Sequence, residues 1–153
     1  MFVRTFFAGW GDMDFNSHMK NTAYLDKSAD IRMMFFAEQG FPVSEFQRLK
    51  IGPVVMKDEL EYFREVHLLE EVRVDLNIAG LSEDGSRFSI RNEFVRPDGK
   101  TAARVTSTGG WMDLSARRLI VAPTMLLDAL RKSPRATDFQ QFPTSVKPQS
   151  GSQ

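Results

Sequence analysis

The residues best suited to chemistry lie in one short polar segment, between a predicted strand and a predicted helix. Asp12, Asp14, Asn16 and His18 supply two carboxylates, an amide and an imidazole at alternating positions. A helix N-terminus presents unpaired N–H groups and a partial positive charge, which can polarise a carbonyl or hold a developing oxyanion. A carboxylate beside it can attack an activated acyl carbon or activate a water molecule. The segment therefore favours acyl transfer, although Asp, Asn and Ser are also ordinary capping residues in front of a helix.

Other kinds of site fit this segment less well. In a calcium loop that starts at Asp12, position 6 needs Gly and position 12 needs Glu, but the chain has Ser17 and Ala23 there. A metal site made from Asp12, Asp14 and His18 matches no strong ligand spacing. A Ser-His-Asp triad lacks its G-x-S-x-G nucleophile elbow. We therefore expect no metal at this segment.

The elements around the segment can be predicted from residue patterning. Residues 2–8 are aromatic and β-branched, which predicts a strand that ends at Gly9. Apolar residues recur with helical spacing over residues 21–39, and Gly40 and Pro42 predict the end of this helix. A helix this long with an apolar face needs a sheet to bury it.

Consecutive antiparallel strands are predicted after the long helix, and the alternation of apolar and polar residues is clearest over 72–78. One helix covers only one face of a sheet, so we expect a homo-oligomer, either a dimer or a tetramer. We expect one domain over residues 1–135 and a flexible tail over 136–153, whose end is rich in Gln, Ser and Pro. The predicted elements are a short helix at 44–50, strands at 54–66, 72–78, 88–94, 101–113 and 119–122, and a last helix at 123–132.

Composition excludes several classes of function. The 153 residues carry 20 basic and 20 acidic side chains, so the net charge is zero and gives no bulk attraction to nucleic acid. The absence of Cys excludes disulfides, thiolate metal sites and a Cys nucleophile. No apolar run is long enough for a membrane span, and the N-terminus has no signal-peptide pattern. A cytoplasmic protein is the expectation.

The chain resembles the hotdog-fold acyl-CoA thioesterases of the hydroxybenzoyl-CoA thioesterase-like group over about residues 2–130. That group opens with a strand followed by aromatic-x-Asp-x-Asp-x-x-x-His-x-x-Asn-x-x-Tyr. Weaker matches follow over residues 61–64, 70–74 and 96–103. The opening pattern is formed here by Trp10, Asp12, Asp14, His18, Asn21 and Tyr24.

The resemblance implies an α+β fold in which an antiparallel sheet wraps around one long central helix. It implies hydrolysis of the thioester of an acyl-CoA or acyl carrier protein, without metal or redox cofactor, at an interface between two protomers. Asp14 matches the catalytic carboxylate, acting as nucleophile or general base, while the helix N-terminus polarises the thioester carbonyl. His18, Asn21 and Tyr24 match substrate-positioning residues.

Arginines beyond residue 85 are candidates for the phosphates of coenzyme A, because guanidinium groups bind phosphate through paired hydrogen bonds. Arg87 represents this group, which also contains Arg91, Arg96 and Arg104. His67 is interpreted as an ordinary surface histidine. Two other functions stay open, a non-catalytic acyl-CoA-binding module and a hotdog hydroxyacyl dehydratase.

Overall fold

One long helix forms the centre of the computed structural model, which describes residues 1–144 and 146. This helix, α1 (Asn21–Glu38), ends where Gly40 takes a φ of 86°, a conformation that glycine adopts without steric cost. The helix predicted over 21–39 is therefore confirmed to within one residue. Its buried residues share one face and are Ala23, Tyr24, Ser28, Ile31, Phe35 and Phe36.

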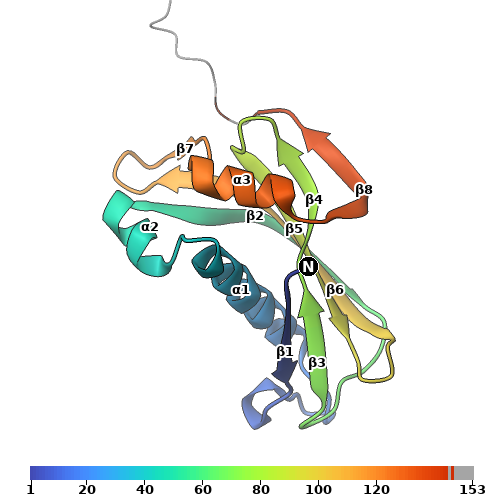
Figure 1. Cartoon of the computed structure of the whole chain (residues 1–153). Coiled ribbons are helices and arrows are strands. Elements are labelled where there is room, and N and C mark those ends of the chain that lie inside the picture. The colour runs from blue at the N-terminus through green and yellow to red at the C-terminus, as the bar shows by residue number, and fades with distance from the viewer. Residues whose placement is uncertain (145, 147–153) are drawn as a thin grey trace, which may run out of the picture.

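A curved sheet wraps around α1 (Figure 1). Among the described residues it has eight strands, and every pairing is antiparallel except that of β4 with β8. The central strands are β5 and β6; β2 lies at one edge beside β6, while β1 and β8 lie beside β3 and β4 at the other. This is the α+β arrangement that the resemblance predicts. The elements are β1 (Val3–Phe7), α2 (Val43–Leu49), β2 (Ile51–Tyr62), β3 (Glu71–Asp75), β4 (Asn77–Ser82), β5 (Arg87–Val95), β6 (Thr101–Asp113), β7 (Arg118–Ile120), α3 (Thr124–Lys132) and β8 (Arg135–Phe142).

The alternation within β5 separates a core face from an outer face. Phe88, Ile90 and Phe94 are buried in the core, because residues two apart in a strand point to the same side of the sheet. Arg87 and Arg91 occupy the other set of positions and are only partly buried. The sheet thus gives one apolar face to α1 and a polar face to its surroundings.

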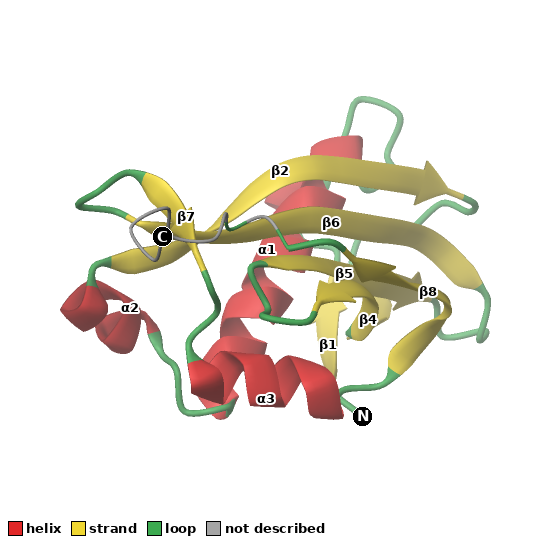
Figure 2. Ribbon diagram, turned by 90° about the horizontal axis from the view of Figure 1, so that it is seen from above, coloured by secondary structure: helices red, strands yellow, loops and turns green. Residues whose placement is uncertain are grey.

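Trp111 of β6 anchors the core at the end of the sheet that α2 and α3 approach (Figure 2). Its side chain is fully buried, stacks on Phe46 and meets Phe36 edge to face. Its indole N–H donates a 2.9 Å hydrogen bond to the carbonyl of Gly85. A buried Trp needs such a partner, so this bond lets the largest side chain of the core stay away from water.

The strand predicted over 54–66 was wrong at its C-terminal end. The backbone amides of Phe63 and Arg64 both donate to the carbonyl of Ala102, at 2.8 and 3.0 Å. Two donors on one acceptor cannot continue a regular ladder, in which each residue has its own partner. The chain therefore leaves the sheet after Tyr62, and residues 63–67 approach the segment that precedes α1.

The strand predicted over 72–78 is broken at Leu76 into β3 and β4. Asn92, which interrupts the apolar alternation of β5, lies opposite this break. Its side-chain amide donates a 2.8 Å hydrogen bond to the carbonyl of Asp75, and the Asp75 carboxylate accepts one from the backbone N–H of Glu93. Side chains thus replace ladder bonds where the long strand bends.

The tail prediction was wrong for residues 136–142, which lie in β8 parallel to β4. Phe142 lies against Gly80, and the Arg91 guanidinium donates to the Asp138 carboxylate. These contacts depend on the folded sheet, so composition alone did not reveal them. Residues 145 and 147–153 of the predicted tail lie outside the described residues.

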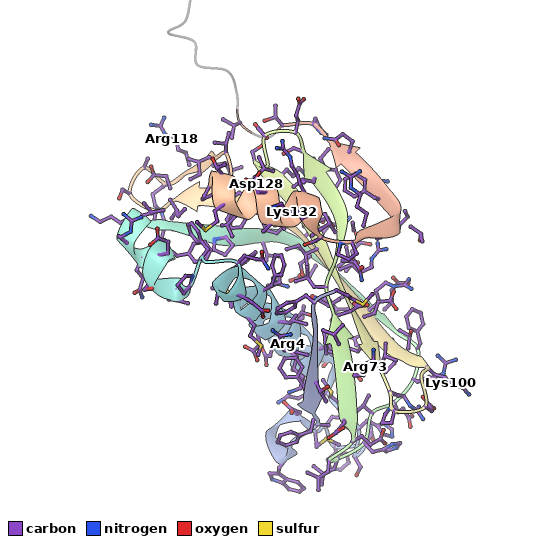
Figure 3. All side chains as sticks on the ribbon, viewed as in Figure 1. Arg4, Arg73, Lys100, Arg118, Asp128 and Lys132 are labelled. Carbon is purple, nitrogen blue, oxygen red and sulfur yellow. The ribbon has the colours of Figure 1, made fainter. Side chains whose placement is uncertain are left out.

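Charged side chains are distributed around the outside of the molecule. Arg73, Lys100, Arg118 and Asp128 are exposed and come from four different regions of the chain (Figure 3). In the described part of the chain, no helix combines the length and apolar character needed to cross a membrane.

Candidate functional site

The polar segment before α1 folds into a tight loop that holds Asp14 by its backbone. Met13 and Met19 form a β-bridge, and the N–H of Asp14 donates to the carbonyl of His18 at 2.8 Å. Ser17 takes a φ of 65°, which turns the chain back. Asp14 Oδ1 accepts hydrogen bonds from the backbone N–H groups of Asn16 and His18, at 2.8 and 3.1 Å. One carboxylate oxygen is thus bound to the loop while the residue as a whole stays exposed.

Asp12 has different surroundings, although it belongs to the same motif. It ends the short 3₁₀ helix Trp10–Asp12, and its Oδ2 accepts a 2.8 Å hydrogen bond from the N–H of Gly9. The same oxygen lies 3.0 Å from the Lys27 ammonium of α1. Burial by itself would raise the pKa of Asp12, but these two partners outweigh it and hold the pKa below its ordinary value. Asp12 therefore ties the loop to α1 as a charged group.

Asp14 lines a cavity of about 350 Å³ at the start of α1. Lys20, the N-cap residue of α1, makes no side-chain capping bond, while Asn21 Oδ1 accepts a 3.0 Å hydrogen bond from the N–H of Thr22 in the first turn. Of the residues predicted for the site, Asp14, His18 and Asn21 are brought together here. The full lining is Asp14, His18, Met19, Asn21, Tyr62, Phe63, Arg64 and Glu65.

A second hollow of about 400 Å³ lies on another side of Asp14. It is bounded by apolar side chains, including Trp10 and Phe15, which are 84% and 101% exposed, and Leu68. Asp14 therefore lies between two hollows, one at the start of α1 and one that exposed apolar side chains border. Such exposed aromatic groups at a carboxylate are typical of a surface that contacts a ligand or another chain.

Tyr24 lies beneath the site rather than in its lining. Its side chain is 3% exposed and packs edge to face on Tyr62 and Phe94. Burial first, and then the nearby charges of Asp14 and Glu70 together with Tyr62, raise the pKa of Tyr24 to about 12. Tyr24 therefore stays neutral and supports the floor of the site.

Arg87 lies in a separate cavity that shares no lining residue with the cavity of Asp14. Its guanidinium carbon is 4.7 Å from the centre of the Phe142 ring, so it stacks on β8. The cation that lines the Asp14 cavity is Arg64, whose Nη1 donates to the Thr101 carbonyl at 2.9 Å. Sequence reasoning did not assign Arg64 to the site, because it falls within the strand predicted over 54–66, where an arginine is ordinary.

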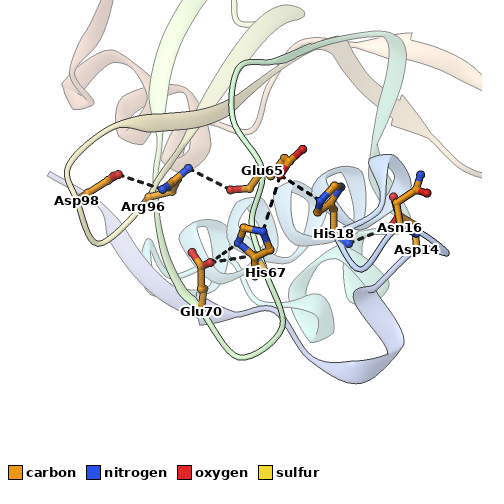
Figure 4. Close-up of polar contacts among 8 residues, drawn as sticks. All are labelled: Asp14, Asn16, His18, Glu65, His67, Glu70, Arg96 and Asp98. Atoms are coloured by element: carbon orange, nitrogen blue, oxygen red, sulfur yellow. Dashed lines mark hydrogen bonds and ion pairs between the residues drawn. The ribbon is translucent and has the colours of Figure 1, made fainter.

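Glu65 and His67 were also missed as parts of this region. Figure 4 shows the Glu65 carboxylate between the rings of His18 and His67. His18 Nε2 lies 3.0 Å from Glu65 Oε2, and the two imidazole ring centres are 5.5 Å apart. The available signal was the order Glu65-Val66-His67, which puts two polar groups on one side of an extended segment and a buried valine on the other.

The chain matches the thioesterase-like superfamily over residues 8–130. No curated protein is close enough in sequence to match it. Among solved structures, a Staphylococcus aureus protein in complex with CoA is 21% identical, with a TM-score of 0.79 over 89% of this chain and 87% of the other.

Two further solved structures are named as thioesterases. A gentisyl-coenzyme A thioesterase is 21% identical, with a TM-score of 0.75 over 84% of this chain and 98% of its own. The 1,4-dihydroxy-2-naphthoyl-CoA thioesterase from Synechocystis is 14% identical, with a TM-score of 0.77 over 86% and 96%. At these identities the likeness establishes the hotdog fold, while the match over residues 8–130 establishes the family. The chain belongs to the thioesterase-like superfamily.

Proposed function

We propose that this protein hydrolyses acyl-CoA thioesters, with Asp14 as the reacting carboxylate. The observation that carries the proposal is that Asp14 and the first residue of α1, Asn21, line one cavity. This arrangement places a carboxylate that is held by its own loop and the first residue of a helix in the wall of one cavity. Hydrolysis of a thioester uses both parts, an anionic base or nucleophile for attack and a partial positive charge beside the carbonyl oxygen.

The chemistry follows from these two parts. The thioester carbonyl oxygen points to the N-terminus of α1, where the helix dipole stabilises the negative charge that develops during attack. Asp14 either attacks the carbonyl carbon or takes a proton from a water molecule that attacks it. In both cases the C–S bond breaks, the coenzyme A sulfur gains a proton, and water supplies the second oxygen of the acid. His18 and Asn21 position the thioester from the cavity wall.

The surroundings of Asp14 support a CoA thioester as the substrate class. Arg64, which lines the cavity, supplies a cation for the phosphates of coenzyme A. Trp10 and Phe15 offer apolar contact for an acyl group in the second hollow. One solved neighbour contains CoA, and two others are named for aromatic acyl groups, so aryl-CoA esters are the first substrates to test.

We infer that the active form is a homodimer that pairs through β2. Among the described strands β2 pairs only with β6, so its other edge carries unpaired backbone groups. Val55, Met56 and Tyr62 of this strand are 42%, 55% and 51% exposed. A second copy at this edge covers these apolar side chains and comes close to the cavity, which Tyr62 lines.

The test is thiol release from a panel of acyl-CoA esters by the wild type and by Asp14→Asn. We expect Asp14→Asn to lower kcat/KM by about 100-fold or more, because the amide is neither a nucleophile nor a base. Asp30→Asn is the matched control, since Asp30 is exposed further along α1 and should keep full turnover. Sedimentation of both variants checks that the oligomer is unchanged.

Two results would contradict the proposal. Equal turnover by Asp14→Asn and wild type would remove Asp14 from the reaction. If the wild type bound CoA esters but hydrolysed neither CoA esters nor carrier-protein esters, the result would instead support the non-catalytic binding module.

A further inference from the structure

The strongest cluster of metal-ligating side chains in the described residues is formed by His18, Glu65 and His67. One ligand atom from each lies within 4.8 Å of the other two. His18 Nε2 is 3.0 Å and His67 Nε2 is 3.8 Å from the same atom, Glu65 Oε2. Donors bound to one zinc ion at 2.0–2.1 Å in a tetrahedron are about 3.3 Å apart, so these distances lie near those of a real site.

The backbone holds this cluster together from two segments far apart in sequence. The N–H of Met19 donates to the carbonyl of Val66 at 2.8 Å, which places His18 beside the 65–67 segment. Val66 is fully buried, so its neighbours Glu65 and His67 point together to the opposite side. Arg96 donates from Nη1 to the Glu65 carbonyl at 3.3 Å, which adds a third contact to the segment.

The ring of His67 is oriented by a carboxylate on its far side. Glu70 Oε1 lies 2.7 Å from His67 Nδ1, and it also accepts the backbone N–H of His67 at 3.3 Å (Figure 4). In the tautomer that donates from Nδ1 to this carboxylate, Nε2 keeps its lone pair for a metal ion. Histidines that bind metals usually donate their other ring N–H to a carboxylate, a backbone carbonyl or a water molecule, and Glu70 fills this role here.

We propose that His18, Glu65 and His67 bind a divalent transition-metal ion, with zinc as the best fit. Two imidazoles and one carboxylate are a ligand set that zinc accepts at sites that keep a fourth position for water. The side chains of the three residues are 32%, 60% and 53% exposed, which leaves room for that water and a path for the ion. Calcium and magnesium prefer oxygen ligands throughout and fit the two nitrogens poorly.

Simple ion pairing explains the cluster less completely. An ion pair between each histidine and Glu65 requires both imidazoles to be protonated, which sets two positive rings edge to face at 5.5 Å. Metal binding requires both rings to be neutral, and one cation then satisfies all three donors. This cluster shares His18 with the proposed thioesterase site, and His18 and Glu65 both line the Asp14 cavity, but the proposed thioester hydrolysis itself requires no metal.

The test measures zinc binding to the full-length, untagged protein after chelator treatment, by titration calorimetry and by metal analysis after dialysis. We expect one zinc per chain. Loss of a hydrogen bond that supports a metal ligand weakens metal binding by ~10-fold, and we expect this effect for Glu70→Ala. Glu65→Gln and His67→Asn each remove a ligand, so we expect both to weaken zinc binding by more than that. Glu59→Gln is the control, because Glu59 is an exposed carboxylate on β2 that pairs with Lys57.

Cobalt gives a second, spectroscopic measurement. Cobalt added to the wild type should produce the visible absorption of a four-coordinate site, and this band should be lost in His67→Asn and retained in Glu59→Gln. Circular dichroism confirms that each variant is folded. The proposal is overturned if the wild type takes up no stoichiometric zinc, or if Glu65→Gln and His67→Asn both bind zinc as the wild type does.

Discussion

Removing the charge of Asp12 is expected to lower stability rather than abolish turnover. The substitution Asp12→Asn keeps an acceptor for the N–H of Gly9 but removes the negative charge 3.0 Å from Lys27 Nζ. The side chain of Lys27 is only 13% exposed and that of Asp12 27%. The ammonium therefore loses its partner in a place where water compensates poorly.

The size of the effect follows from this partial burial. Exposed ion pairs contribute about 0.2–1 kcal/mol, and removing one partner of a buried pair costs about 3–5 kcal/mol. The Asp12–Lys27 pair lies between these limits, so we expect the free energy of unfolding to fall by about 2 kcal/mol. In a domain of this size each kcal/mol shifts the Tm by roughly 2–4 °C, which gives a decrease of about 4–8 °C.

The effect of Asp12→Asn should depend on pH in a defined direction. Burial raises the pKa of Asp12 in the folded protein, but its partners outweigh burial and hold this pKa below its ordinary value. A carboxyl group with a lowered pKa contributes stability above its unfolded pKa and loses it as the pH falls through the folded value. The stability difference between wild type and Asp12→Asn should therefore be complete at neutral pH and shrink below roughly pH 4.

Thermal unfolding followed by circular dichroism measures these quantities for wild type, Asp12→Asn, Lys27→Met and the double variant. A double-mutant cycle isolates the pairwise energy from the effects of each single change. A Tm equal to that of the wild type would refute the reasoning about the ion pair. Loss of turnover as large as in Asp14→Asn, with unchanged stability, would instead make Asp12 the reacting carboxylate.

Two further predictions concern the core and the last strand. Trp111→Phe leaves the carbonyl of Gly85 without its donor and should lower the free energy of unfolding, measured by urea denaturation, by about 1–3 kcal/mol or more. The control Trp10→Phe, at an exposed position, should leave the free energy of unfolding unchanged. Equal losses in the two variants would contradict this reasoning. Gly80→Ala puts a methyl group into the space of the Phe142 ring and should lower the free energy of unfolding by about 1–3 kcal/mol. Adding Phe142→Leu should recover part of that loss. If Gly80→Ala were as stable as the wild type, β8 would not pack against β4 at this position.

The long helix and the positions of most strands along the chain could be predicted from the sequence because both depend on local periodicity. The apolar face of α1 and the end of this helix before Gly40 depend on the residues of one segment. The alternation of buried and partly exposed residues in β5 and β6 likewise depends on each strand's own sequence. The break at Leu76 and the position of β8 were not predictable in this way. Both depend on contacts with other strands, through Asn92 in the first case and Phe142 in the second.

The same division holds for the candidate site. The sequence by itself determined that Asp14, His18 and Asn21 lie close together, because they are near neighbours in a loop that leads into a helix. The sequence also placed Asp12 and Asp14 in one motif, but their spacing did not show how the surroundings of the two carboxylates differ. Only the tertiary structure decided that Lys27 neutralises Asp12, since that pairing requires α1 to pack beside the loop.

Only the tertiary structure also decided which distant residues join the site. Glu65 and His67 lie beside His18 because the N–H of Met19 donates a hydrogen bond to the carbonyl of Val66, 47 positions further along the chain. Arg87, favoured by its residue type, lies instead against β8 on the outer face of the sheet. Residue type and spacing specify the chemistry that a segment can perform. Which distant residues join that segment depends on how the sheet closes around the helix, and this closure depends on the whole chain.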